Sequence, residues 1–329
     1  MKKILLFLLL LVTSFSLFGC RGNAHDISEY FLELEYKEDF RILQISDTHL
    51  GVKEDLDKQF GFLGNLIDKA NADLLIINGD IFTFASQDTA KALFSFLDSK
   101  KIVWTVTFGN HDEQCYFSID WLTNYLNKLN DSSTSYCIFK DISDDDIFGH
   151  SNFVINLTSG GKVKDQIIII DSNRYNYGEY TYYDYIHLDQ IEWYKNVVNY
   201  SKIQNGGEIV RSVMYFHIPF PEFSDAYDEA KNGNATLILG EKREDVCSPR
   251  INTNLFSVIK ELGSTVAVNC AHDHINDYII NYKGIYLAYG VKSANNIYYD
   301  EELLGGLILT LQESDIHYEQ IFCSYDEVE

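Results

Sequence analysis

Short apolar runs alternate with amphipathic stretches along the first half of the chain. Aliphatic runs of strand length occur at Arg41–Ser46, Leu74–Ile77 and Val103–Phe108. Patterns of helical period follow them at Leu56–Ala70, Ala85–Leu97 and Ser118–Leu129. Strands that alternate with helices are typical of an α/β sheet with crossover connections. The first half therefore predicts a sheet whose strands are joined by helices.

The second half of the chain is richer in strands. Apolar or alternating runs occur at Phe153–Leu157, Gln166–Asp171, Ile209–Phe216, Thr265–Asn269, Asp277–Tyr282, Ile285–Tyr289, Leu307–Leu311 and His317–Phe322. Helices are expected at Leu188–Tyr200 and Asn254–Leu262. No linker divides the two halves and no internal repeat is present. We therefore predict one domain over residues 39–329, built from two sheets with helices outside.

The composition is that of an ordinary globular protein, with 46% hydrophobic and 23% charged residues. Lys and Arg number 26 against 49 Asp and Glu, which gives a net charge of −23. Such a surface repels polyanions at long range and disfavours a nucleic-acid-binding role by phosphate neutralisation; no nucleic-acid partner is expected. It still allows a small phosphorylated substrate, because a bound metal ion reverses the local field.

The first twenty residues have the pattern of a targeting segment. Lys2 and Lys3 precede the apolar run Ile4–Phe18, which is short for a membrane span. The run ends in Leu17-Phe18-Gly19-Cys20, which resembles a bacterial lipoprotein signal with Cys20 as the acylated residue. An ordinary signal peptide or an uncleaved anchor helix are the alternatives, and each places the folded part outside the cytoplasm. We expect a signal peptide over 1–19, an acidic tether over 20–38, and a lipid anchor on Cys20 at the cell membrane.

The remaining cysteines form no metal or disulfide motif. With Cys20 set aside, they are Cys115, Cys137, Cys247, Cys270 and Cys323. An odd number without a CxxC pair is neither a disulfide framework nor a zinc ribbon. We expect most of them to be small core residues, and one disulfide bridge stays open.

Five polar clusters come directly after predicted strands. The carboxyl ends of strands in open α/β sheets meet at one crevice, so these side chains are expected to gather there. Aspartate, histidine and asparagine without cysteine form a ligand set that suits manganese, iron or zinc. The clusters are Asp47-Thr48-His49, Gly79-Asp80, Gly109-Asn110-His111-Asp112, His217 and His272-Asp273-His274.

In this order the five clusters resemble the calcineurin-like metallophosphoesterase superfamily, with the pattern D-x-H, G-D, G-N-H-[DE], H and G-H-x-H. The segments QISDTHLG, GNHDE, QIEWY and CAHDHIND are most similar to its purple-acid-phosphatase-like branch. The resemblance implies a four-layer α-β-β-α sandwich of two mixed sheets flanked by helices. Two positions depart from the pattern. Ala271 replaces a usual glycine, and no tyrosine follows Gly79-Asp80, so no purple Fe(III) colour is expected.

The same resemblance assigns roles to individual residues. It implies that Asp47, His49 and His274 bind one divalent metal ion, that Asn110, His217 and His272 bind a second, and that Asp80 bridges the two. His111 is not a ligand in this pattern and is a candidate general acid. Asp112 is expected to orient it.

The function implied is hydrolysis of phosphate monoesters by in-line attack of a metal-bridging hydroxide. No P-loop and no GxSxG motif favours another mechanism. Two alternatives remain open. One is a phosphodiesterase acting on a cyclic nucleotide or a glycerophosphodiester, and the other is a ligand-binding lipoprotein without turnover. The tyrosines of Tyr175–Tyr185 either stack on an aromatic or sugar leaving group or pack on the domain.

Overall fold

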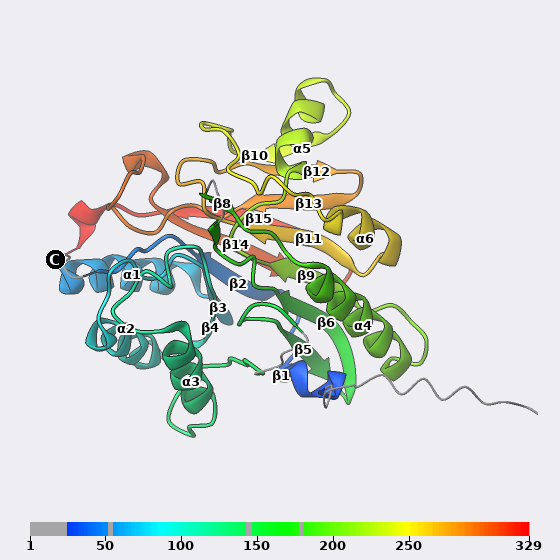
Figure 1. Ribbon diagram of the computed structural model, residues 1–329, viewed down its shortest axis with the longest axis horizontal. Coiled ribbons are helices and arrows are strands. Elements are labelled where there is room, and N and C mark those ends of the chain that lie inside the picture. Colours follow the sequence, from blue (N-terminus) through cyan, green and yellow to red (C-terminus); the bar gives the residue numbers. More distant parts are fainter. Residues whose placement is uncertain (1–24, 52–54, 143–146, 178–180, 329) are drawn as a thin grey trace, which may run out of the picture.

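The computed structural model describes residues 25–51, 55–142, 147–177 and 181–328 (Figure 1). The expected signal peptide and Cys20 lie outside the described residues. Within the described part of the chain, no helix is long and apolar enough to cross a membrane. The five cysteines in these ranges are all free, so none of them forms the bridge that the sequence left open.

Two mixed sheets form the centre of the molecule. The larger has eight strands in the order β1-β5-β6-β9-β11-β13-β12-β10 and the smaller has five in the order β15-β14-β2-β3-β4. The first comprises β1 (Phe31–Glu35), β5 (Phe153–Ser159), β6 (Lys162–Ile169), β9 (Arg211–Tyr215), β10 (Thr236–Leu239), β11 (Thr265–Cys270), β12 (Ile279–Tyr282) and β13 (Ile285–Tyr289). The second comprises β2 (Phe40–Ile45), β3 (Leu74–Asn78), β4 (Val103–Thr107), β14 (Gly305–Leu311) and β15 (Ile316–Phe322).

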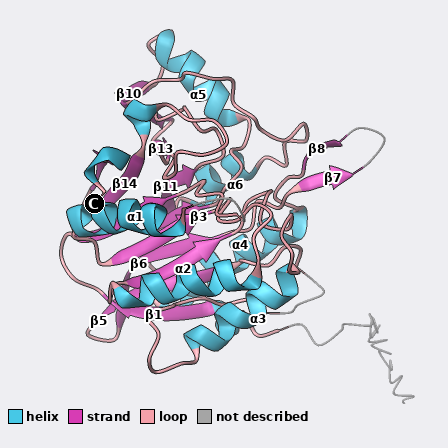
Figure 2. Ribbon diagram, turned by 90° about the vertical axis from the view of Figure 1, so that its left-hand side faces the viewer, coloured by secondary structure: helices cyan, strands magenta, loops and turns pink. Residues whose placement is uncertain are grey.

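Helices cover the outer faces of both sheets (Figure 1). Those on the five-stranded sheet are α1 (Leu56–Ala70), α2 (Gln87–Ser99) and α3 (Ile119–Asn130). Those beside the eight-stranded sheet are α4 (Leu188–Gln204), α5 (Glu222–Lys231) and α6 (Leu255–Leu262). A separate hairpin, β7 (Tyr175–Tyr177) and β8 (Thr181–Tyr183), projects from the body in Figure 2.

The alternation of side chains along the eight-stranded sheet explains the layers. Ile167 and Val213 face the core shared with the other sheet, whereas Ile168 and Met214 face the core beneath α4 and α6. Side chains alternate with period two, so a strand that is apolar at every position is buried on both faces. The predicted four-layer α-β-β-α sandwich is confirmed.

Part of the segment expected to be a tether is a strand of the larger sheet. Residues 20–38 were expected to be a tether, but β1 pairs in parallel with β5 and forms an edge of the larger sheet. In the segment FLELE the leucines are partly buried against the core between the sheets, while Glu33 and Glu35 are exposed. The acidic composition hid this alternation. Three other short elements, α5, β10 and the hairpin, were also not predicted.

Candidate metal centre

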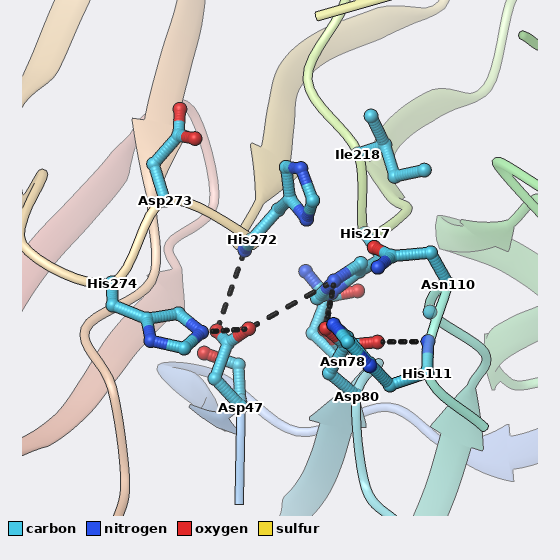
Figure 3. A network of polar contacts seen from close by, with 12 residues as sticks. Asp47, Asn78, Asp80, Asn110, His111, His217, Ile218, His272, Asp273 and His274 are labelled. Carbon is cyan, nitrogen blue, oxygen red and sulfur yellow. Dashed lines mark hydrogen bonds and ion pairs between the residues drawn. The ribbon is translucent and has the colours of Figure 1, made fainter. Parts of the chain in front are cut away.

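The polar clusters that follow the strands meet at one end of the sandwich. Asp47, Asp80 and Asn110 lie in the loops after β2, β3 and β4 of the smaller sheet. His217 and His272 lie in the loops after β9 and β11 of the larger sheet. Figure 3 shows these loops converging on one centre, while Asp273 points away from it. The centre is therefore built from both sheets.

The candidate ligands form two adjacent triads. Asp47, His49 and His274 make one, and Asp80, His217 and His272 make the other; within each triad the ligand atoms lie within 4.8 Å of one another. Asp80 stands between them. Its Oδ2 lies 3.2 Å from His217 Nε2 and 3.8 Å from His49 Nε2. The triads contain six of the seven residues that the sequence assigned as ligands, and Asn110, the seventh, lies beside them in Figure 3.

Backbone conformation at these residues is unusual. Asp47, His49, Asp80 and His272 have positive φ values of 53°, 43°, 48° and 78°. Non-glycine residues in this region cost of order 1–3 kcal/mol each and cluster at functional sites. Ala271, which replaces the family's glycine, is not among the described residues with positive φ. Alanine therefore fits there without strain, as the sequence suggested.

Two glycines allow the loops to approach closely. A Cβ added to Gly79, whose φ is +81°, would meet the His217 imidazole at 2.4 Å. A Cβ added to Gly109 would meet Oδ1 of Asp80 at 2.3 Å. Any side chain at either position would displace a candidate ligand, because real Cβ atoms do not come this close.

Outer hydrogen bonds fix the direction of the imidazoles. Nδ1 of His217 donates to the Asn78 carbonyl at 2.9 Å, and Nδ1 of His274 donates to the Tyr298 carbonyl at 2.8 Å. A carbonyl only accepts, so each ring carries its proton on Nδ1 and turns Nε2 toward the centre. Such partners are typical of metal-binding histidines, because they set the tautomer and the ring orientation.

Several buried polar atoms at the centre are available to bind cations. Asn110 Oδ1 and both ring nitrogens of His272 have no hydrogen-bond partner among the described residues, although both side chains are buried. Nε2 of His49 and Nε2 of His274 lie 3.0 Å apart. Buried polar atoms are normally satisfied, and two ring nitrogens this close need either a shared proton or a metal cation between them. The donors present fit two divalent metal ions, which the structure itself does not contain.

Burial also sets the charge of the candidate ligands. It lowers the pKa of His272 to about 3 and holds the pKa of His49 well below its usual value. Both imidazoles are therefore neutral, as metal binding requires. Burial opposes a charge on His217 as well, but the carboxylates of Asp80 and Asp47 raise its pKa to about 10. A metal ion at this triad would take the place of that proton.

Asp112 does not orient His111, and this expectation is wrong. Its buried carboxylate accepts hydrogen bonds from Phe82 N at 2.9 Å and Gly109 N at 2.8 Å, and so joins two loops. His111 Nδ1 instead pairs with Gln114 Oε1 at 2.7 Å. These loop residues form a turn in which position i+3 faces position i, as the bond from Gln114 N to the His111 carbonyl shows. The half-buried His111 ring lies beside His49, with ring centroids 5.1 Å apart.

Sequence reasoning missed a buried lysine beneath the centre. Nζ of Lys292 donates to the Asp47 carbonyl at 2.7 Å, and the residue is 1% exposed. It follows β13 at the same end of the sheet as the five clusters. Its position just after a predicted strand could have placed it near the centre, but a single lysine does not match a metal-ligand motif.

The sequence profile of the calcineurin-like phosphoesterase family matches residues 40–246. The chain belongs to this family. The match covers five of the seven candidate ligands, and His272 and His274 lie beyond it. The family match is therefore consistent with the two-sheet fold and with the two candidate metal-binding triads.

Named relatives of this calcineurin-like phosphoesterase include purple-acid-phosphatase-like proteins. Probable inactive purple acid phosphatase 29 of Arabidopsis thaliana is 28% identical over 290 residues, which cover 79% of this chain and 73% of that protein. Phosphatase DCR2 of Saccharomyces cerevisiae is 26% identical over 280 residues, which cover 76% of this chain and 47% of that protein. The crystal structure of a dimetal phosphatase from Danio rerio superposes with a TM-score of 0.57 at 12% identity, covering 86% of this chain and 96% of that one. This last similarity supports the fold.

Proposed function

We propose that this chain hydrolyses phosphate monoesters at a two-metal centre. The observation that carries the proposal is the position of Asp80, whose carboxylate lies within reach of both triads. A carboxylate has two oxygens and a negative charge, so it suits a position between two cations. Asp47, His49 and His274 would hold one ion, and Asn110, His217 and His272 the other, with Asp80 shared.

The chain's own residues position the substrate and supply a proton. Two divalent cations, when bound, would provide Lewis acidity toward the phosphoryl oxygens and water of lowered pKa. His111 lies at the edge of the centre, where its backbone N donates to Asp80 Oδ1 at 2.8 Å. Its Nδ1 donates to Gln114 Oε1, so the protonated ring carries its second proton on Nε2, and transfer of that proton to the leaving oxygen leaves the neutral ring. A positioned general acid contributes roughly 10²–10⁴-fold in rate.

The word "inactive" in the name of the plant relative raises the alternative of a scaffold without turnover. In this chain Asp80, Asn110 and His111 are all present and gathered at the centre. A scaffold that only binds a ligand has no need of a general acid aligned by a glutamine. The assembled site therefore favours turnover.

The test is phosphate release by the purified chain after metal removal and reconstitution with Mn²⁺, Fe²⁺ or Zn²⁺. We expect p-nitrophenol release from p-nitrophenyl phosphate to depend on added metal and to exceed release from bis-p-nitrophenyl phosphate. Activity confined to the diester would replace this proposal with a phosphodiesterase. If the chain binds metal but releases p-nitrophenol from neither ester, the proposal is wrong and the alternative of a ligand-binding protein without turnover remains.

We further propose that the chain is tethered through a lipid on Cys20 at the outer face of the cell membrane. Lys2, Lys3 and the apolar run before Cys20 support this. Growth with radiolabelled palmitate is expected to label the wild-type chain and not the Cys20→Ala variant, because that thiol is the acyl acceptor. Cys115→Ala is the matched control and should remain labelled. Equal labelling of the wild type and Cys20→Ala would contradict the anchor.

A further inference from the structure

The hairpin β7–β8 contacts two candidate ligands of the second metal ion. The Tyr175 hydroxyl accepts a hydrogen bond from Asn110 Nδ2 at 2.8 Å. The Tyr183 ring meets His272 edge-on, with centroids 4.5 Å apart and an interplanar angle of 88°. The two tyrosine rings stack on each other at 5.4 Å. One small hairpin thus contacts two of the candidate ligands of a single ion.

Asn110 needs a partner for its amide nitrogen. The residue is 1% exposed, and its Oδ1 has no hydrogen-bond partner in the part of the chain that the structure describes. An amide binds a metal through oxygen only, so its NH₂ group must find an acceptor elsewhere. Tyr175 provides that acceptor. Burial raises the pKa of Tyr175 above its usual value, so the phenol stays protonated and neutral.

The base of the hairpin is held to the loop that carries Asn110. Arg174, the residue before Tyr175, forms an ion pair with Glu113 in the turn that follows Asn110. The Arg174 carbonyl also accepts from Asp184 N at 2.9 Å, which closes the hairpin. Arg174 thus contacts the Asn110 loop through its side chain and the other strand of the hairpin through its carbonyl. These two contacts position the neighbouring Tyr175.

We infer that Tyr175 is a positioning residue that orients the Asn110 amide so that Oδ1 serves the second metal ion. This inference rests on the proposed two-metal function and deepens it. Loss of the hydroxyl leaves a buried NH₂ group without an acceptor, so the amide turns away or admits water. Outer partners of metal ligands typically contribute 10- to 100-fold in metal affinity or activity. The first triad should be unaffected, because Asn110 is not among its ligands.

The experiment is calorimetric titration of the metal-free chain with Mn²⁺ alone. Tyr175→Phe is expected to weaken one of two binding events by roughly 10- to 100-fold and to leave the other unchanged. Tyr177→Phe, on the same strand and 70% exposed, is the matched control and should change neither. A general structural effect would weaken both events together and lower the melting temperature of the metal-free chain, and that result would overturn the inference.

A second background isolates the hydroxyl's action on the amide. Asn110→Ala removes the amide that the Tyr175 hydroxyl contacts, so Tyr175→Phe should cause no further loss of Mn²⁺ affinity in that background. Equal weakening in both backgrounds would overturn the inference. If Tyr175→Phe leaves both binding events unchanged, the inference about Tyr175 is wrong, but the proposed function still stands. If the wild-type chain binds no Mn²⁺, both the inference and the proposed function are wrong.

Discussion

Replacing Asp80 with asparagine is expected to reduce phosphate release below detection and to remove the second equivalent of bound metal. The asparagine side chain has nearly the same shape but a single oxygen and no charge. It can still accept from His111 N, yet it cannot bind one ion on each side. Metal content by atomic emission and turnover with p-nitrophenyl phosphate check the result.

Two controls make the Asp80 result specific. Asp88→Asn changes an exposed carboxylate on α2, whose partner is Lys91, and should leave metal content and turnover unchanged. The change also removes the buried partner of His217, so a thermal melt of the metal-free Asp80→Asn chain must show that it is folded before its metal content is compared. Two bound ions with normal turnover in Asp80→Asn would refute the bridging role.

His111→Gln is expected to lower turnover by roughly 10²–10⁴-fold while metal content stays near the wild-type value. The structure supports this separation, because neither candidate triad includes His111. The loss should be larger for an alkyl phosphate than for p-nitrophenyl phosphate, since p-nitrophenolate leaves readily without a proton. Parallel assays with both esters and metal analysis provide the measurement.

His150→Gln is the matched control for the general acid. His150 is half-buried on a different loop, and its Nδ1 lies 3.5 Å from an Asp141 oxygen. Its replacement should leave both esters hydrolysed at the wild-type rate. If metal content collapses in His111→Gln, His111 is a ligand and the present assignment is wrong.

The sequence predicted the position of the centre because each cluster directly follows a strand. Apolar runs such as Leu74–Ile77 show in the sequence where each strand ends. The carboxyl ends of the strands then meet at one edge of the sheet, independently of the length of the connecting segments. The placement of Asp47, Asp80 and His217 therefore needed only the strand pattern. Their family resemblance supplied the roles.

What the sequence did not predict depends on geometry within and between loops. Adjacent residues in a turn point in different directions, so the pairing of His111 with Gln114 rather than Asp112 could not be read from adjacency. Tyr175 reaches Asn110 across 65 positions of sequence, through a hairpin with no strong strand pattern. β1 was concealed because its alternate residues are acidic.

The centre draws its donors from both sheets, and this gives the ions a mechanical role as well as a chemical one. Asp47 and His49 come from the smaller sheet and His274 from the larger, while Asp80 and His272 repeat that division at the second triad. Each cation would cross-link the two halves of the sandwich. Without metal ions the two sheets would lose this cross-link at one end, and we expect the metal-free chain to be cleaved by proteases more readily than the metal-bound chain.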